Sequence, residues 1–481
     1  VEGAGAHRFL EWPWRPLRSA ERVAWRVAAA PDGEWSPWHE FEAGLFDPDW
    51  TARWISPPEA SEQPAGTRPA HVLTTTFELS GTAPTARLYA TALGLYEVFV
   101  NGVRAGTAEL TPGTSAYEHT VYAQAYDVTA NLTTGTNTLE IVLSDGWYHG
   151  RFGAFRRPVD WGPTVAARAE LHLRLDDGTR RVVATDGAWT ARTSQIVRAD
   201  LMDGQTSDLT VAPSGRQPVL IDEVVGPTIA WSPAPPVRCI EERPVEEFTR
   251  LDSGAWIADF GQNASGWLAL SNLGPAGTRT VIEHGEHLGA DGDLDTTHLD
   301  GVDPGQPPMP FVQRDEVVSD GSDASFEPRH TVHGFRYARI EREGPLDASD
   351  LTMRVVHTDL RPTGTFECSN PDLTRLFEVA RWSFRGNAVD IPTDCPTRER
   401  LGWTGDYQVF APTATRMYDV LGFSRKWLQA VRDDQLDDGR IANYSPDGRR
   451  IKHHLDDLFA ILTGSAGWGD AIVLVPWELY R

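Results

Sequence analysis

The sequence lacks several features that would define a protein class at once. It has only three cysteines in 481 residues, Cys239, Cys368 and Cys395, which are too few for a disulfide framework and too widely spaced for a CxxC metal site. No run approaches the roughly 18 apolar residues that a membrane helix needs. There is no G-x-x-x-x-G-K-[ST] motif, no G-x-S-x-G motif and no Rossmann glycine pattern ahead of a helix. These absences argue against disulfide-stapled, membrane-spanning, nucleotide-binding and serine-hydrolase proteins.

Positive charge is also scarce. The chain has 44 Lys and Arg against 68 Asp and Glu, a formal net charge of −24 at pH 7. A protein this acidic repels phosphate backbones, so we expect no nucleic-acid partner, whereas a neutral polyhydroxyl ligand is indifferent to the charge. The few cysteines favour a reducing, cytoplasmic location, although large secreted bacterial proteins also use few. No signal peptide is visible, but the chain begins at Val1 without a methionine, so the location stays open.

Tryptophan, by contrast, is abundant. The 18 tryptophans equal the number of phenylalanines. Flat apolar side chains of this kind stack on sugar rings or on bases, although most tryptophans in a β-rich protein simply fill the cores of its sandwiches.

Short alternating segments predict that the first 360 residues are β-structure. Leucine alternates with polar residues over 171–175, the period-2 pattern of a strand with one buried face. Asp177-Gly178 then favours a tight hairpin, as does Asn101-Gly102 after an apolar run. No helical pattern interleaves with these strands, so the sequence favours all-β sandwich or jelly-roll domains over a parallel α/β sheet.

From about residue 365 the pattern changes to helices. Asn370-Pro371 is typical of a helix start, with Asn as the N-cap, and an apolar stripe at helical spacing runs from there to Phe384. Further helices are expected over 423–431, 455–462 and 471–480. So few helices do not close a core, and the last stops at Arg481 without a cap or breaker. We therefore expect the chain to be cut off within a helical domain.

The densest polar cluster is the segment 390–406, which holds four carboxylates, two arginines and a tryptophan in 17 residues. Its prolines and glycines forbid a continuous helix, so we expect an ordered loop between two helices. Glycosidic bond cleavage needs one carboxylic acid to protonate the leaving oxygen and a second carboxylate to activate water or to attack. Neighbouring carboxylates and a desolvating tryptophan favour a protonated acid, whereas the arginines oppose it unless they pair with Asp394 or Asp406. The alternative interpretation is a loop of surface salt bridges.

The stretch 394–406, DCPTRERLGWTGD, resembles the signature of bacterial α-L-rhamnosidases of glycoside hydrolase family 78. Other stretches resemble the domains of that family in the same order, at 33–55, 95–150, 259–267, 335–337 and 366–371. The resemblance implies a multidomain protein made of a partial fibronectin-like β module (1–55), a jelly-roll domain that is a candidate carbohydrate-binding module (65–215), a concanavalin-like β-sandwich (240–360) and the first part of an (α/α)6 six-hairpin barrel (365–481). It also implies inverting hydrolysis of terminal α-L-rhamnosyl residues from glycosides.

The resemblance also implies roles for five residues of the loop. Glu399 occupies the position of the general acid. Asp394 and Asp406 match carboxylates that hold rhamnose hydroxyls. Arg398 would bind a hydroxyl or fix a neighbouring carboxylate, and Trp403 would line the apolar face of the sugar.

The resemblance also covers a second segment of the sugar pocket, but the general base of the family has no counterpart in this chain. Trp468 and Asp470, in the stretch 467–470, resemble another part of the sugar pocket. The general base of the family is a Glu from the late part of the barrel, past Arg481, so we expect this chain to lack it. The glutamates at 367, 378 and 478 have ordinary helix-surface interpretations, and none is proposed in its place.

No cofactor or catalytic metal is expected. His284 and His287 have metal-ligand types, but on a strand they face opposite sides. His453-His454 fits a helix entry better than a cation site. Rhamnose-binding modules of the family use calcium, and the loops around Asp145 and Asn101 are the candidates for it.

Two other functions stay open. One is a carbohydrate-binding protein or fragment without catalysis, which the missing base favours. The other is a glycosidase for a different sugar, since six-hairpin barrels serve several. In the leading interpretation the partners are rhamnose-containing glycosides, with no membrane partner, and a homodimer is left open.

Overall fold

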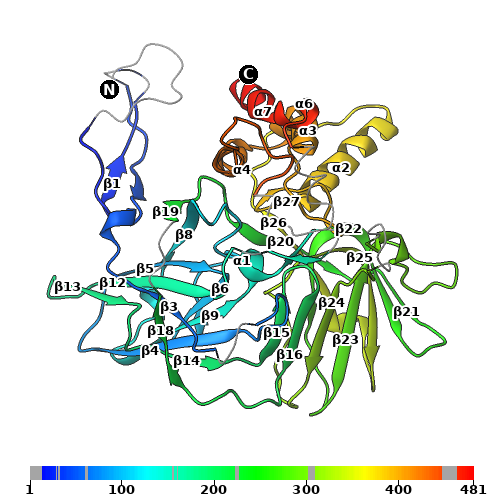
Figure 1. Ribbon diagram of the computed structural model, residues 1–481, viewed down its shortest axis with the longest axis horizontal. Helices are drawn as coiled ribbons and strands as arrows, with labels where there is room; N and C mark the ends of the chain where they lie inside the picture. The colour runs from blue at the N-terminus through cyan, green and yellow to red at the C-terminus, as the bar shows by residue number, and fades with distance from the viewer. Residues whose placement is uncertain are drawn as a thin grey trace.

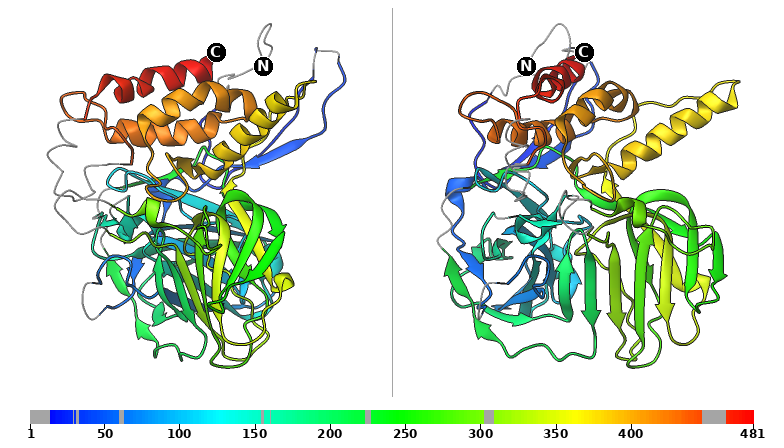
Figure 2. Two further views of the ribbon diagram at one scale, coloured as in Figure 1. Left: turned by 90° about the vertical axis from the view of Figure 1, so that its right-hand side faces the viewer. Right: turned by 45° about the vertical axis from the view of Figure 1, so that its right-hand side comes forward.

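The computed structural model describes residues 14–28, 30, 33–59, 63–153, 156–159, 161–222, 227–301, 309–446 and 463–481. A β-rich body carries a group of helices on one side, and an N-terminal hairpin rises beside them (Figures 1 and 2). That hairpin is formed by β1 (Arg22–Trp25) and β2 (His39–Glu42). The expectation of a mostly β region followed by helices is confirmed.

Two sheets enclose the core of the first sandwich. The first has the order β18-β3-β12-β5-β8-β19, with β13 beside β12, and the second β17-β14-β4-β9-β6-β7. The predicted hairpins at Asp177-Gly178 and Asn101-Gly102 are both present, and Asn101 and Gly102 have the positive φ values of 52° and 77° that such a turn requires. The strands of the first sheet are β3 (Trp54–Ser56), β5 (Thr85–Leu93), β8 (Thr120–Asp127), β12 (Ala166–Arg174), β13 (Arg180–Ala184), β18 (Leu220–Asp222) and β19 (Thr228–Trp231); those of the second are β4 (His71–Leu79), β6 (Leu95–Val100), β7 (Val103–Arg104), β9 (Gly135–Ser144), β14 (Thr190–Thr193) and β17 (Gln217–Pro218).

A nine-stranded sheet forms the rest of the β body. Its order is β15-β16-β24-β23-β25-β22-β26-β20, with β21 beside β22. The β15–β16 hairpin forms one end of this sheet through the parallel pairing of β16 with β24. The strands are β15 (Ile196–Asp200), β16 (Gly204–Asp208), β20 (Val237–Pro244), β21 (Glu247–Arg250), β22 (Trp256–Leu270), β23 (Arg279–Gly285), β24 (Arg314–Val318), β25 (His333–Arg342) and β26 (Leu351–Thr358). Shorter elements are β10 (Arg151–Phe152), β11 (Arg157–Pro158), α1 (Gly146–His149), η1 (Asp47–Asp49), η2 (Thr129–Asn131), η3 (Thr297–Leu299) and η4 (Ala348–Asp350).

The helices lie on top of the two β units (Figure 2). They are α2 (Pro371–Gly386), α3 (Thr404–Met417), α4 (Leu421–Asp433), α6 (Ala466–Gly469) and α7 (Ala471–Tyr480), with a small hairpin of β27 (Ala388–Val389) and β28 (Ile391–Pro392) between α2 and α3. The predicted helices at 371, 423–431 and 471–480 are confirmed, and the Asn370 side chain caps α2 by accepting a hydrogen bond from the Asp372 N–H at 2.9 Å. The helix expected over 455–462 lies outside the described residues. No helix in the described part of the chain is long and apolar enough to cross a membrane.

The apolar stripe of α2 is buried at only one end. Phe384 is 4% exposed, whereas Leu373 and Leu376 are 48% and 62% exposed. The reason is visible in Figure 2, where the first turns of α2 project beyond the β body and only the last turns rest on it. Helical spacing therefore identified the helix but not what its stripe contacts.

Candidate active site

The carboxylate-rich segment lies between the β27–β28 hairpin and α3, directly on the nine-stranded sheet. A Cβ built on Gly334 of β25 would stand 2.7 Å from the Pro396 carbonyl oxygen, so glycine allows this close approach. The expectation of a loop holds for residues 393–403. It is wrong at both ends, because Ile391 and Pro392 form β28 and residues 404–406 form the first turn of α3.

Glu399 is fixed by neighbours within the loop. Its Oε2 accepts a hydrogen bond from the Trp403 indole N–H at 3.0 Å, and its Oε1 lies 3.1 Å from the Arg398 guanidinium. The Glu399 backbone N–H donates to the Cys395 sulfur at 3.3 Å. The Trp403 ring in turn packs on Tyr444, with ring centroids 4.9 Å apart. The Glu399 side chain is only 18% exposed, so it does not point into bulk solvent.

Asp394 and Asp406 lie within electrostatic reach of Glu399. Burial, with a smaller contribution from the Glu399 charge, raises the pKa of Asp394 to about 6. The Asp394 backbone N–H donates to the Leu401 carbonyl at 3.0 Å, and the Asp394 carboxylate accepts from the Leu401 N–H at 2.8 Å. Burial, again with a contribution from Glu399, raises the pKa of Asp406. The Glu399 charge thus opposes the ionisation of both Asp394 and Asp406.

The raised pKa of Asp394 predicts a pH-dependent stability. The folded carboxyl holds its proton up to about pH 6, whereas the unfolded one releases it near 3.8. The folded state therefore binds more protons between these values, and the contribution is complete below about pH 4 and lost as the pH rises through 6. This carboxyl lowers the free energy of unfolding by at most about 3 kcal/mol as the pH rises from 4 to 6. We expect Asp394→Asn to remove that decrease. Melting temperatures from pH 4 to 7 measure it; a profile parallel to that of the wild type would contradict the assignment, and Asp470→Asn, at an exposed site, is the control.

The two arginines of the loop are not paired with Asp394 or Asp406. Arg398 contacts Glu399, as described above, because its exposed side chain lies beside it. Arg400 instead turns away into the interior, where it bonds to backbone carbonyl oxygens and to Gln313. The pairing that would have favoured a protonated Glu399 is therefore absent from the structure of these residues.

The second predicted pocket segment lies partly beside the loop. Trp468 is in α6, and a Cβ built on Gly405 would stand only 2.9 Å from the Nε1 of its indole. This contact brings Trp468, 39% exposed, to the start of α3. Asp470 lies at the junction of α6 and α7 and is exposed. The structure thus joins Arg398, Glu399 and Trp403 by hydrogen bonds. Asp394 and Asp406 interact with the Glu399 charge, Trp468 lies beside the start of α3, and Asp470 lies at the C-terminal end of α6.

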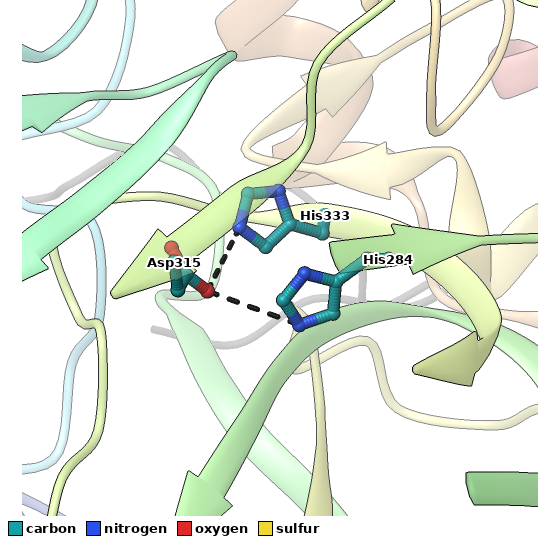
Figure 3. Close-up of side chains that lie close together, drawn as sticks. All are labelled: His284, Asp315 and His333. Atoms are coloured by element: carbon teal, nitrogen blue, oxygen red, sulfur yellow. Dashed lines mark hydrogen bonds and ion pairs between the residues drawn. The ribbon is translucent and has the colours of Figure 1, made fainter. Parts of the chain in front are cut away.

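A buried cluster under the loop was missed by sequence reasoning. His284 of β23, Asp315 of β24 and His333 of β25 lie together (Figure 3), and no sequence pattern connects these three positions. Asp315 Oδ2 lies 3.0 Å from His333 Nε2 and 3.8 Å from His284 Nε2, and the possible ligand atoms all lie within 4.8 Å of one another.

The two histidines of this cluster are uncharged at neutral pH, whereas Asp315 is largely ionised there. Burial holds the pKa of His284 at about 3 and that of His333 well below its usual value, and it raises that of Asp315 to about 6. The buried guanidinium of Arg400 adds to the lowering at both histidines and disfavours a further cation. We therefore interpret the cluster as part of the support beneath the loop.

In the two loops considered for calcium, the side chains of Asp145 and Asn101 already have protein partners. The Asp145 carboxylate is fully buried and is paired with Arg68, with a further hydrogen bond from the Gly66 N–H. The Asn101 side chain bonds to Asn137 and to backbone groups. These residues do not fit a calcium site as arranged.

One cavity of the β body does not include the predicted carboxylates. It has a volume of about 590 Å³ and is lined by the nine-stranded sheet and its loops, including His284, Phe311 and Gln313. A much smaller void of about 20 Å³ lies directly under the loop, between Leu201, Val332, Pro396 and Arg400.

Three family models match the chain in succession. Residues 81–243 match the alpha-L-rhamnosidase N-terminal domain, residues 249–357 the bacterial alpha-L-rhamnosidase concanavalin-like domain, and residues 361–481 the bacterial alpha-L-rhamnosidase 6 hairpin glycosidase domain. β-Sandwiches that lead into a glycosidase domain with clustered carboxylates define the class of multidomain glycosidases. Within that class, the chain belongs to the bacterial α-L-rhamnosidase family.

Individual relatives agree with this family. An α-L-rhamnosidase of Streptomyces avermitilis is 37% identical over 82% of this chain and 38% of its own length, and one of an Alteromonas species is 32% identical over 99% and 52%. The solved structure of a Streptomyces avermitilis α-L-rhamnosidase complexed with L-rhamnose has a TM-score of 0.86 at 27% identity, covering 97% of this chain and 61% of that one. The α-L-rhamnosidase of Aspergillus terreus has a TM-score of 0.85 at 32% identity, covering 98% and 55%. The chain spans between 38% and 53% of the length of the curated relatives it matches.

Proposed function

We propose that this chain carries the acid-bearing part of an α-L-rhamnosidase site, which hydrolyses terminal α-L-rhamnosyl residues of glycosides with inversion. The observation that carries the proposal is the Glu399 carboxyl, held 3.0 Å from the Trp403 indole nitrogen, with Asp394 and Asp406 near enough to interact with its charge. The names of its relatives and the L-rhamnose complex of a structural neighbour support the choice of sugar. The proposal includes the division of the chain into four domains: the partial fibronectin-like module (1–55), the jelly-roll domain (65–215), the concanavalin-like sandwich (240–360) and the first part of the barrel (365–481).

In this proposal Glu399 gives its proton to the glycosidic oxygen as the bond to the anomeric carbon breaks. A water attacks the opposite face of that carbon and passes a proton to a general base, which yields the inverted sugar and the free alcohol. The two carboxyl groups of such a pair stand about 6.5–9.5 Å apart. No residue of this chain is proposed as the base; the family resemblance assigns it to a later part of the barrel.

The other residues bind the sugar. Asp394 and Asp406 accept hydrogen bonds from its hydroxyls, and Trp403 and Trp468 cover its apolar face. Arg398 now donates to the oxygen of Glu399 that a proton would occupy, so we propose that it moves to a sugar hydroxyl when substrate binds. Asp470 contributes to the outer wall.

The test compares p-nitrophenyl α-L-rhamnoside with the matching α-D-glucoside, using the protein expressed from its complete coding sequence. Hydrolysis of the rhamnoside alone, with β-L-rhamnose as the first anomer seen by NMR, is the expected result. Hydrolysis of the glucoside alone would instead show a glycosidase that is specific for another sugar. Rhamnose binding by calorimetry, with no turnover of either substrate, would instead support a carbohydrate-binding protein.

A further inference from the structure

The buried side chain of Arg400 ties the carboxylate loop to the β body beneath it. Arg400 is 7% exposed. Its Nε donates to the Thr397 carbonyl in its own loop at 3.2 Å, and one terminal nitrogen donates to the carbonyls of Leu201, at 3.0 Å, and Val332. The other donates to Gln313 Oε1 at 2.6 Å. One guanidinium thus joins the loop to the segment after β15, to the segment before β24 and to the segment before β25.

Gln313 is oriented to receive this contact. Its Oε1 also accepts from the Gly334 N–H at 3.0 Å, and its Nε2 donates to the Gly334 carbonyl at 2.9 Å. These two bonds fix which end of the amide faces Arg400. The guanidinium therefore meets preformed acceptors, and burial together with the nearby Arg156 lowers its pKa to about 9, which leaves it charged at neutral pH.

The residue before Glu399 is tied down as well. Arg156 donates from one terminal nitrogen to the Arg398 carbonyl at 2.6 Å, and its Nε donates to Asp203 at 3.1 Å. Arg156 is itself buried. Glu399 is therefore flanked on one side by an anchored carbonyl and on the other by an anchored side chain.

The backbone at Arg400 needs this anchoring. Its φ of +54° lies in the left-handed region, which is unfavourable for a non-glycine residue. With this turn, the Glu399 side chain faces Trp403 while the next side chain enters the β body. A relaxed backbone would turn the Glu399 carboxyl away from its present place.

We propose that Arg400 and Arg156 are positioning residues that hold the Glu399 carboxyl where it protonates the glycosidic oxygen. The inference rests on the proposed role of Glu399. A displacement of about 1 Å in a catalytic group lowers a rate by up to about 10²-fold, so anchoring on this scale controls proton donation.

The test is the leaving-group dependence of Arg400→Lys in the protein from the complete coding sequence. Lysine keeps the charge but cannot make four divergent hydrogen bonds. We expect kcat on an alkyl α-L-rhamnoside, whose leaving group needs the proton, to fall about 10–100-fold. We expect kcat on p-nitrophenyl α-L-rhamnoside, whose leaving group needs little proton donation, to fall less than about threefold, with KM similarly unchanged. Arg156→Lys, which leaves the Arg400 contacts intact, should show the same selectivity to a smaller extent.

The matched control is Arg385→Lys. Arg385 is also 7% exposed and ties α2 to the β body through His357 and Glu241, at 2.9 Å each, but it does not touch the loop. Its substitution should change kcat by the same factor on both substrates. If Arg400→Lys and Arg156→Lys also lower kcat equally on the two substrates, the positioning role is overturned. If Glu399→Gln itself shows no leaving-group dependence, the proposed function fails, which is a separate outcome.

Discussion

Glu399→Gln is expected to lower kcat on an alkyl α-L-rhamnoside by about 10²–10⁴-fold, the range attributed to one acid–base group. Glutamine has the shape of glutamate, and its carbonyl oxygen accepts the Trp403 indole bond that Glu399 Oε2 now accepts at 3.0 Å. It has no proton to give to the leaving oxygen. KM should therefore change little, and the loss on p-nitrophenyl α-L-rhamnoside should be smaller because that leaving group departs with little help.

Glu378→Gln provides the control for this result. Glu378 lies on α2, where its side chain pairs with Arg381, so its substitution removes a carboxylate of the helical region without touching the loop. Its kinetics should match those of the wild type. If Glu399→Gln keeps wild-type turnover on both substrates, Glu399 is not the general acid.

Lys426→Met is expected to destabilise the contact between the helices and the first sandwich by about 3–5 kcal/mol. Lys426, on α4, is 2% exposed and contacts Asp390, whose other oxygen accepts from the Thr114 N–H at 2.6 Å. The ammonium also lies 4.9 Å from the centre of the Tyr122 ring. Methionine fills a similar volume but leaves the Asp390 carboxylate buried without its cation. Native-state hydrogen exchange of the α4 amides measures the free energy of opening.

Two further variants separate the buried pair from a general loss of charge. Arg361→Met breaks an ion pair to Asp419 whose side chains are 72% and 47% exposed, and it should cost less than about 1 kcal/mol. Lys426→Met combined with Asp390→Asn should recover part of the loss, because no unpaired charge remains. A change below about 1 kcal/mol in Lys426→Met alone would contradict the importance of the pair.

The fold could be predicted from sequence wherever local patterns decide it. Strand alternation, the two hairpin turns and the Asn370 cap are properties of neighbouring residues, and all are present. α3 was missed because Gly405 and Pro412 are helix breakers when considered locally. In the structure the Trp468 indole occupies the space beside Gly405, and buried Tyr407, Ala411 and Ala414 pack α3 against its neighbours. Tertiary packing thus outweighs the local preference.

The candidate site divides in the same way. Its carboxylates lie within 17 residues, so their clustering is visible in the sequence. The groups that hold them lie far away along the chain: Arg400 bonds to Val332, Gln313 and Leu201 across 68, 87 and 199 residues. Nothing in a stretch such as 311–315 marks Gln313 as a partner of the loop. The direction that Arg400 takes was therefore beyond any local pattern.

These long sequence separations also order the events of biosynthesis. A ribosome releases the N-terminal residues first, and domains generally fold as units in that order. All the acceptors outside the loop that Arg400 uses, and Arg156 as well, precede it in the chain. The nascent β-sheets can fold before the turn that carries Glu399 and Arg400 emerges from the exit tunnel. The turn then packs onto sheets that are already folded.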